Sequence, residues 1–294
     1  MTSRLLLIIN PSSGQGRIRQ ARGLIAARLR NLGQLEIVDT TGPGDAGSAA
    51  RRAVESGVDR VIVAGGDGTI NEVINVIAGA RVALGLIPNG TGNVLARELA
   101  IPLDDPGAAC GVIESGRLIS IDLGKFDTRY FVSMAGFGFD AEVVERVEPR
   151  VKNLVGQAAY GIAAVGALLR HKPSHFVLNL DGQLYETDAS LVVVANVSSY
   201  ALRLRLAPDA AYDDGRLDVI IFESTGLTQK ITLLTEALRL ILQRGPETVR
   251  CFRAGKIRVE SQPPVLAQLD GDIAGQTPTY IEVAPSALRI IVPA

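Results

Sequence analysis

The chain has 294 residues, of which 47% are hydrophobic and 21% are charged, a balance typical of a globular protein with a substantial core. Its net charge of −1 excludes the basic footprint of a nucleic-acid-binding protein, and its two cysteines give neither a disulfide framework nor a metal-site spacing. No stretch of about 20 apolar residues is present, so we expect no transmembrane segment, and a cytoplasmic protein in a reducing compartment.

Residues 1–124 alternate short apolar runs with stretches of helical periodicity. Strands are expected at residues 5–9, 35–39, 60–64 and 84–88, and helices at 17–32, 46–56, 70–77, 94–99 and 110–115. This alternation predicts a Rossmann-like α/β domain with a parallel sheet and right-handed crossovers. Because ligands of open α/β sheets bind at the carboxyl ends of the strands, the loops that follow these strands are the candidate binding loops.

The third expected strand runs directly into a glycine-rich turn, Gly65-Gly66-Asp67-Gly68-Thr69. Its glycines let the backbone approach a ligand closely, and amides at the start of the following helix favour an anion. Thr69 can cap that helix, and Asp67 adds a carboxylate that can orient a metal-bound water. The turn therefore predicts a site for a nucleotide phosphate, with an ordinary strand-to-helix turn as the alternative.

A second glycine-rich turn, Asn89-Gly90-Thr91-Gly92-Asn93, follows the fourth expected strand. The two turns are about one βα unit apart, so they should lie side by side at the carboxyl edge of the sheet. Two such turns favour the phosphate site over an ordinary turn. No Gly-x-x-x-x-Gly-Lys-Ser/Thr sequence is present, which excludes a P-loop enzyme.

The two turns, with Asn71-Glu72 between them, resemble the diacylglycerol kinase catalytic-domain family, which includes soluble bacterial lipid kinases and the sphingosine and ceramide kinases. NAD kinases and bacterial 6-phosphofructokinases are more distant relatives. The resemblance implies ATP as cosubstrate and Mg²⁺ as cofactor. The ATP contacts that it implies are Asn10, Gly14, Thr40, Gly65, Gly66, Asp67, Gly68, Thr69, Asn71, Glu72, Gly90, Thr91 and Asn93.

The same resemblance implies two sets of Mg²⁺ ligands. Asp122, in an Ile-Asp-Leu-Gly segment, joins Asp67 in an acidic cluster near the phosphates. In the soluble bacterial branch a structural Mg²⁺ is held by one aspartate before a glycine and by two backbone carbonyls. Here these positions are Asp214, Ala211 and Arg216, and a plain turn acid is the alternative reading of Asp214.

From about residue 125 the pattern changes to strand-like runs separated by turns, which predicts an all-β antiparallel sandwich. The runs are at residues 130–134, 176–181, 190–195, 217–222, 256–260, 265–269 and 279–283. We therefore expect a nucleotide-binding domain at 1–124, a lipid-substrate domain at 125–285, and a return of 286–294 to the first domain. Helices are expected at 152–170 and 228–244, and the apolar face of the second is a candidate membrane-surface contact.

Two further motifs lie in the second part of the chain. Asp270-Gly271-Asp272 matches the family segment that supplies the general base, so Asp272 falls on the base and Asp270 lies beside it. A plain hairpin turn is the alternative. Gly136-x-Gly138-x-Asp140 fits the family segment that faces the active cleft better than it fits a dinucleotide fingerprint, because it lies past the α/β part of the chain.

Together these motifs imply an ATP-dependent lipid kinase that phosphorylates the hydroxyl of a lipid such as diacylglycerol, peripheral to the membrane. The lipid and the oligomeric state, a homodimer included, stay open. An NAD kinase-like enzyme, which shares the Gly-Gly-Asp-Gly sequence, is one alternative. A non-catalytic nucleotide-binding protein is the other, because Val94 stands where the soluble bacterial branch often has an aspartate, and residues 201–203 stand where members usually carry glycines.

Overall fold

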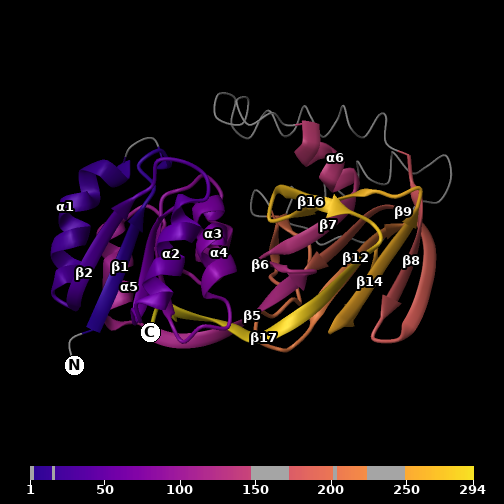
Figure 1. Cartoon of the computed structure of the whole chain (residues 1–294). Coiled ribbons are helices and arrows are strands. Elements are labelled where there is room, and N and C mark those ends of the chain that lie inside the picture. The colour runs from indigo at the N-terminus through magenta and orange to yellow at the C-terminus, as the bar shows by residue number, and fades with distance from the viewer. Residues whose placement is uncertain (1–2, 15–16, 147–171, 201–203, 224–248) are drawn as a thin grey trace. The chain divides into compact units, whose positions relative to one another are not determined.

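The computed structural model describes residues 3–14, 17–146, 172–200, 204–223 and 249–294 (Figure 1). The chain divides into two compact units, which we call unit 1 (Met1–Leu123 with Pro285–Ala294) and unit 2 (Gly124–Ala284). The two helices expected at residues 152–170 and 228–244 lie outside the described residues. Among the helices of the described part, none has the length and apolar character that a membrane span requires.

Unit 1 is built on a parallel sheet in the order β2-β1-β3-β4, with the end of β17 (Thr279–Val292) beside β4. Its strands are β1 (Ser3–Ile9), β2 (Gly33–Asp39), β3 (Arg60–Gly65), β4 (Ala83–Pro88) and the first part of β5 (Arg117–Phe126). Its helices are α1 (Arg17–Arg30), α2 (Asp45–Glu55), α3 (Asp67–Ile77), α4 (Val94–Glu98) and α5 (Pro106–Ser115). Because β1 pairs in register with β2 and β3, and β3 with β4, the carboxyl ends of the four strands are level.

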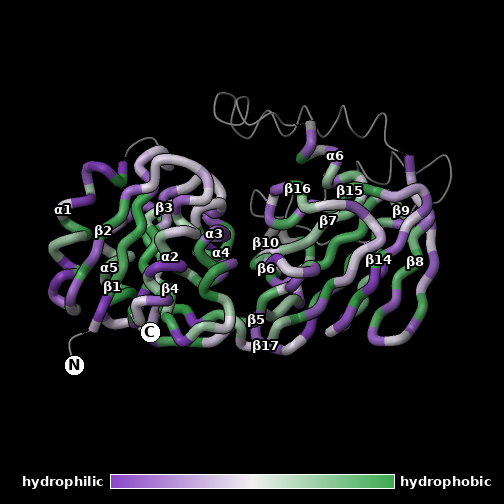
Figure 2. The backbone as a smooth tube through the Cα atoms, viewed as in Figure 1, coloured by the Kyte–Doolittle hydropathy of each residue, from purple (hydrophilic) through white to green (hydrophobic). Residues whose placement is uncertain are grey.

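The central strands are almost continuously apolar because helices cover both faces of the sheet. From residue 5 to its end β1 is buried, as are all of β4 and β3 beyond Arg60. Ile18, Ile25 and Leu29 of α1 pack with residues of α5 on one face, and α2 contacts α3 and β1. Figure 2 shows the hydrophobic colour concentrated on these strands. The outer strand β2 is only partly buried along its length, as expected of an edge.

Two helix starts differ from those expected. The helix α3 begins at Asp67 rather than Ile70, and its N-cap is Gly66, which makes no side-chain cap. The expectation that Thr69 caps this helix is therefore wrong. The helix α5 begins at Pro106, because Asp105 accepts a hydrogen bond from the N–H of Ala108 and proline fits the first helical position.

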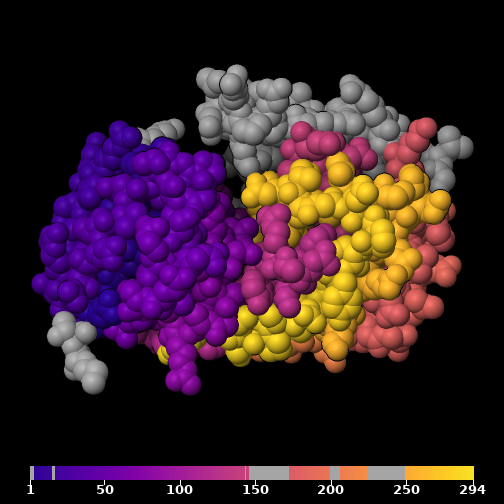
Figure 3. Space-filling view, in the orientation of Figure 1, coloured from indigo at the N-terminus to yellow at the C-terminus, as the bar shows by residue number. Residues whose placement is uncertain are grey.

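Unit 2 is mostly antiparallel, with strands ordered β16-β15-β7-β9-β8-β14-β17 and with β12 pairing β9 and β13. Its remaining strands and its described helix are β6 (Arg129–Phe131), β7 (Met134–Gly138), α6 (Phe139–Arg146), β8 (Ser174–Leu180), β9 (Gln183–Ala195), β10 (Ser199–Tyr200), β11 (Leu204–Arg205), β12 (Leu217–Glu223), β13 (Arg250–Ala254), β14 (Lys256–Gln262), β15 (Leu266–Leu269), β16 (Asp272–Gln276) and β17 (Thr279–Val292). Phe131, Phe137 and Phe176 are fully buried in its core. In Figure 3 the yellow C-terminal strands lie against the magenta segment that includes β6 and β7, although the two are far apart in the chain.

The fold class expected from the sequence is confirmed, since a parallel α/β unit precedes a mostly antiparallel β unit. The single strand expected at residues 130–134 is wrong. Instead β6 ends at Phe131 and β7 begins at Met134, because the N–H groups of residues 132 to 134 donate to the carboxylate of Asp270.

Candidate active site

The loops that the sequence singles out in unit 1 all leave the carboxyl ends of the parallel strands. The N–H of Asn10 donates to the carbonyl of Ala64 (2.9 Å), and the N–H of Asn89 donates to that of Gly65 (2.9 Å). Thr40 is buried, and its N–H donates to the last carbonyl of β1 (2.8 Å). These bonds continue the sheet into the loops, so the loops after β1, β2, β3 and β4 share one edge, as the phosphate-site prediction requires.

The two glycine-rich turns lie in contact at that edge. A Cβ atom built on Gly90 would lie 2.7 Å from the Cα of Gly66 and 2.8 Å from Oδ1 of Asn93. Gly66 itself has φ −95° and ψ −178°, an extended conformation that any residue adopts. The close approach of the two backbones therefore requires glycine here, rather than an unusual dihedral angle.

Asp67 joins the two turns through its carboxylate. One oxygen accepts the N–H of Asn93 (2.7 Å) and the other accepts the N–H of Val94 (2.8 Å), at the start of α4. Burial raises the pKa of Asp67, although these two N–H groups act in the opposite direction. Both oxygens of the carboxylate expected to organise Mg²⁺ thus accept hydrogen bonds from the second turn.

Asparagine side chains order the remaining loops. Asn10 donates from Nδ2 to Oγ1 of Thr69 (2.9 Å), which links the first loop to α3. Asn89 donates from Nδ2 to the carbonyl of Ser13 (2.9 Å), beside Gly14, whose φ of +58° is left-handed. Asn89 is not among the expected contacts, and a buried asparagine directly after a strand is the signal that could have identified it.

The Asn71-Glu72 pair lies on α3 and makes local contacts. Glu72 accepts the N–H of Gly44 at 2.9 Å and that of Gly47 at 3.4 Å, so it holds the start of α2. Asn71 accepts hydrogen bonds from the side chain of Asn75, one turn further along the helix. Their expected contact with ATP stays a prediction.

A cavity of about 430 Å³ opens at the second turn. Gly14, Gly90 and Thr91 line it, together with two arginines, Arg17 and Arg97. The Nε of Arg97 donates to the carbonyl of Gly92 (2.8 Å), which holds this guanidinium at the turn. Arg17 lies 3.5 Å from a carboxylate oxygen of Asp104 and is more than half exposed, at 58%. Neither arginine is among the contacts expected from the sequence, although Arg17 begins α1 and Arg97 lies within the short helix α4, each close to a glycine-rich loop.

Asp122 is placed by a contact of its own. It lies on β5 with an exposed fraction of 3%, and one carboxylate oxygen accepts the N–H of Ser286 (2.7 Å). In the described part of the chain, no group of three or more histidine, cysteine or acidic side chains is arranged to hold a metal.

The Asp270-Gly271-Asp272 segment of unit 2 forms the two-residue turn between β15 and β16. Asp270 and Gly271 have φ of +48° and +91°, and Leu269 pairs with Asp272 across the ladder. Two positive φ values in an Asp-Gly loop are the requirement of a type I′ hairpin. The segment therefore forms a hairpin turn, and Asp272 is exposed as the first residue of β16.

Asp270 has a structural role in that hairpin. Its carboxylate accepts the N–H of Val132 (2.8 Å), Ser133 (2.8 Å) and Met134 (3.0 Å). It therefore anchors the turn between β6 and β7, and charge-assisted hydrogen bonds of this kind are among the stronger ones in proteins.

A buried pair links the same hairpin to the Gly136-to-Asp140 segment. Gln268 accepts the N–H of Gly271 (2.7 Å) and donates from Nε2 to a carboxylate oxygen of Asp140 (2.6 Å). Gln268 is 2% exposed and Asp140 7%. Asp140 lies in the first turn of α6, so the position of this helix and that of the hairpin depend on one hydrogen-bonded chain.

The second expected set of Mg²⁺ ligands lies in the segment before β12. Asp214 accepts the N–H of Arg216 (3.0 Å) on one carboxylate oxygen and pairs with Arg253 through the other. A guanidinium already neutralises this carboxylate, so the residues present do not fit a Mg²⁺ ion held by Asp214 and the carbonyls of Ala211 and Arg216.

Comparison with known proteins follows this division of the chain. Residues 4–126 match the diacylglycerol kinase catalytic domain family, and residues 133–292 match the YegS C-terminal NAD kinase beta sandwich-like domain. The chain is 34% identical over 300 residues to a diacylglycerol kinase of Mycobacterium tuberculosis, covering 99% of this chain and 95% of the relative. It is 32% identical to one of Bacillus subtilis, covering 94% and 91%. A crystal structure of a diacylglycerol kinase from Bacillus anthracis superposes with a TM-score of 0.83 at 27% identity, covering 99% of this chain and 97% of that one.

Proposed function

Since the chain belongs to the diacylglycerol kinase catalytic domain family, we propose that it transfers the γ-phosphoryl group of ATP to the hydroxyl of a lipid such as diacylglycerol. Curated relatives at about one-third identity over almost the whole chain support the reaction class. Those relatives are named diacylglycerol kinases, so diacylglycerol is the acceptor that we propose first.

The observation that carries the proposal is the pair of glycine turns held together at one sheet edge. Phosphoryl transfer depends on positioning the phosphates and stabilising their charge more than on covalent chemistry. The approach of Gly66 to Gly90, fixed by the Asp67 carboxylate, brings the second turn against the start of α3, where the N-cap Gly66 makes no side-chain hydrogen bond. Such a surface binds phosphate through N–H groups.

Charge neutralisation at this edge falls to the two arginines of the cavity. Arg97 is held by the turn itself, and Arg17, at the start of α1, also lines the cavity. We assign both to the triphosphate. Mg²⁺, when bound with the nucleotide, neutralises phosphate charge, and Asp67 and Asp122 stay its candidate protein partners.

We assign the general base to Asp272. A base must present an available carboxylate to the attacking hydroxyl, and Asp272 is exposed on a strand fixed by a type I′ turn. Its neighbour Asp270 is engaged by three backbone N–H groups instead. Asp270 thus acts as a positioning residue for the hairpin that carries the base.

The decisive experiment for the base is the Asp272→Asn variant. The amide keeps the size of the carboxylate but cannot accept the proton, so turnover should fall by about 10² to 10⁴ while ATP affinity stays unchanged. Asp213→Asn, a change at an exposed aspartate in unit 2, is the control and should turn over at the wild-type rate. Wild-type turnover of Asp272→Asn at saturating ATP and lipid would reject the assignment.

The substrate class is tested by incubating the protein with radiolabelled ATP and a panel of acceptors. The panel contains diacylglycerol, phosphatidylglycerol, a sphingoid base and a polyprenol in detergent micelles, with NAD in a separate reaction, and chromatography separates the products. Label in a lipid supports the proposal. Label in NAD alone would favour the NAD kinase-like alternative, and ATP binding without transfer to any acceptor would favour a nucleotide-binding protein without catalysis.

We also propose that the enzyme works at a membrane surface, because its acceptor is a lipid and no described helix could span a bilayer. Co-sedimentation with phospholipid vesicles that contain diacylglycerol measures this directly. The protein should pellet with the vesicles and stay in the supernatant without them. Activity on a water-soluble acceptor together with no vesicle binding would contradict the proposal.

A further inference from the structure

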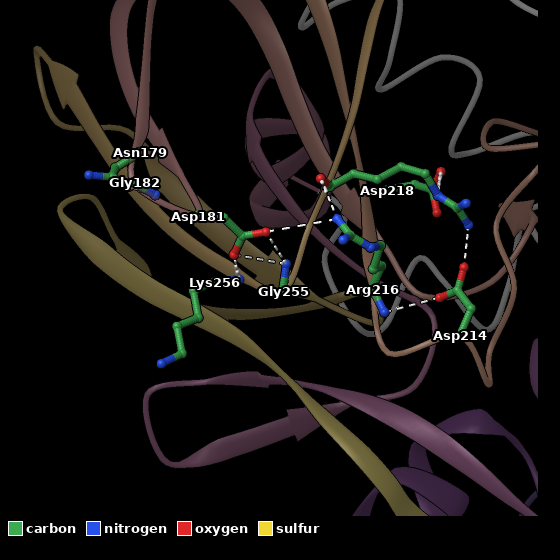
Figure 4. A network of polar contacts seen from close by, with 9 residues as sticks. Asn179, Asp181, Gly182, Asp214, Arg216, Asp218, Gly255 and Lys256 are labelled. Atoms are coloured by element: carbon green, nitrogen blue, oxygen red, sulfur yellow. Dashed lines mark hydrogen bonds and ion pairs between the residues drawn. The ribbon is translucent and has the colours of Figure 1, made fainter.

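A chain of charged groups surrounds Asp214, where the family resemblance places a structural Mg²⁺. One carboxylate oxygen of Asp214 accepts the backbone N–H of Arg216 at 3.0 Å. Figure 4 draws this contact as a dashed line. The other oxygen pairs with the guanidinium of Arg253. A divalent cation at this carboxylate would stand next to a permanent positive charge and be repelled by it.

The position of Arg253 is set by the ladder between β12 and β13. Arg253 lies directly opposite Asp218 in that register, and its Nε is 3.4 Å from a carboxylate oxygen of Asp218. Its Nη2 also lies 3.5 Å from the carbonyl oxygen of Asp209. The guanidinium thus contacts two carboxylates and one backbone carbonyl, which are the oxygen ligands that Mg²⁺ prefers.

A second arginine extends the network to the neighbouring turn. The guanidinium of Arg216 lies 4.0 Å from a carboxylate oxygen of Asp181, and Asp181 accepts the N–H groups of Gly255 (3.0 Å) and Lys256 (2.8 Å). Figure 4 places Asp181, Arg216 and Asp214 in one network of contacts. The two residues that follow β13 are therefore held by Asp181. Through Arg216 and Asp214, Asp181 belongs to the same network of charges as Arg253 of β13.

We propose that Arg253 replaces the structural Mg²⁺ in this protein, so that its guanidinium is the cation that ties the segment before β12 to β13. Three observations support this assignment: the ion pair to Asp214, the cross-strand contact with Asp218, and the carbonyl of Asp209. A planar, permanently charged group with several N–H donors can satisfy several oxygen acceptors at once. Unit 2 should consequently keep its stability without a metal.

The test is thermal unfolding of the full chain, without nucleotide, in excess EDTA and in about 5 mM Mg²⁺. Wild-type Tm should agree in the two solutions within about 1 °C. Arg253→Met should lower Tm by about 3 °C or more, because it leaves without their cation two carboxylates, Asp214 and Asp218, whose side chains are only 28% and 13% exposed. Arg250→Met is the matched control on the same strand, where the arginine is 66% exposed and contacts Glu223 at 3.4 Å, and it should change Tm by about 1 °C or less.

Two results would overturn the assignment. The first is a wild-type Tm that falls in EDTA, with the fall abolished by Asp214→Asn, because that pattern requires a metal at Asp214. The second is an Arg253→Met protein as stable as Arg250→Met. If Arg253→Met does not fold, calorimetric titration of Mg²⁺ into the wild-type protein decides the question, since heat that disappears in Asp214→Asn means a metal site. Only stability and metal binding are measured, so the outcome is independent of the lipid kinase assay.

Discussion

The contact between the two glycine turns makes Gly90→Ala the most informative single change in unit 1. The new methyl carbon would lie 2.7 Å from the Cα of Gly66, whereas carbon atoms in contact prefer about 3.5–4.0 Å, so the turns must separate by about 1 Å. Overpacking of this kind costs about 1–3 kcal/mol. The methyl group also crowds Oδ1 of Asn93, and losing its hydrogen bond from the Gly90 N–H adds about 1 kcal/mol.

We therefore expect Gly90→Ala to destabilise unit 1 by about 2–4 kcal/mol, which corresponds to a fall of roughly 5–15 °C in Tm. A displacement of about 1 Å at the phosphate site should also lower turnover by about 100-fold or more. Differential scanning calorimetry without ligand measures the first effect, and the kinase assay measures the second.

Gly68→Ala is the matched control, because it lies in the same motif and a Cβ there would meet no atom within 4 Å. Alanine is also a better helix former than glycine by up to about 1 kcal/mol, and Gly68 lies in the first turn of α3. Its Tm should be unchanged or slightly raised. A Gly90→Ala protein that unfolds within about 2 °C of Gly68→Ala would refute the reasoning that backbone contact requires glycine at this position.

Three further outcomes are expected. In the folded protein at pH 8, a thiol reagent should modify Cys251, which is exposed, and spare Cys110, because full burial raises the pKa of Cys110 to about 11. After denaturation both cysteines should react. The hydrogen bond from the Tyr185 hydroxyl is the main cause of the lowered pKa of Glu223. The ionised carboxylate therefore stabilises the protein above the ordinary pKa of 4.5, and this stabilisation is lost as the pH falls through the lowered pKa. Glu223→Gln should flatten the acid limb of a plot of unfolding free energy against pH, and an unchanged limb would contradict this. Asp67→Asn should weaken the binding of Mg²⁺-free ATP by about tenfold, because an amide nitrogen cannot accept the N–H groups of the second turn. Displacement of a fluorescent nucleotide in EDTA measures this affinity. An unchanged affinity would favour a metal-binding role for Asp67 instead.

The parallel sheet of unit 1 could be predicted because its strands are buried on both faces. Such strands leave unbroken apolar runs in the sequence, and β1, β3 and β4 were expected within one or two residues of their observed bounds. The two glycine turns were equally visible, since close approach of backbones needs glycine, and glycine is read directly from the sequence.

Contacts between distant residues left no such pattern. The Asp270-Gly271 pair predicts a hairpin locally, but the N–H groups that its carboxylate accepts belong to residues 132 to 134, far back in the chain. The same holds for Asp67, whose partners start a different helix. The sequence alone does not distinguish an aspartate that binds a metal from one that accepts a proton or one that accepts hydrogen bonds from backbone N–H groups.

Arg253 shows most clearly which contacts cannot be predicted from the sequence. The aspartate, the glycine and the carbonyl positions of the expected metal site are all present in the sequence around Asp214. Arg253, which pairs with Asp214, lies on β13, and its position depends on the pairing register between β12 and β13. No local sequence pattern predicts that register.

The division of unit 1 between the two ends of the chain also bears on how the protein is made. Residues 285–294 belong to this unit, and Arg289 and Ile290 of β17 pair with β4 at the end of the sheet. During synthesis the first 123 residues leave the ribosome long before those partners exist, so the outer side of β4 stays an open sheet edge while all of unit 2 is translated. Open edges of this kind invite pairing with other chains. Expression of residues 1–124 alone should therefore yield an aggregation-prone fragment, and adding a peptide that spans 285–294 should improve its recovery.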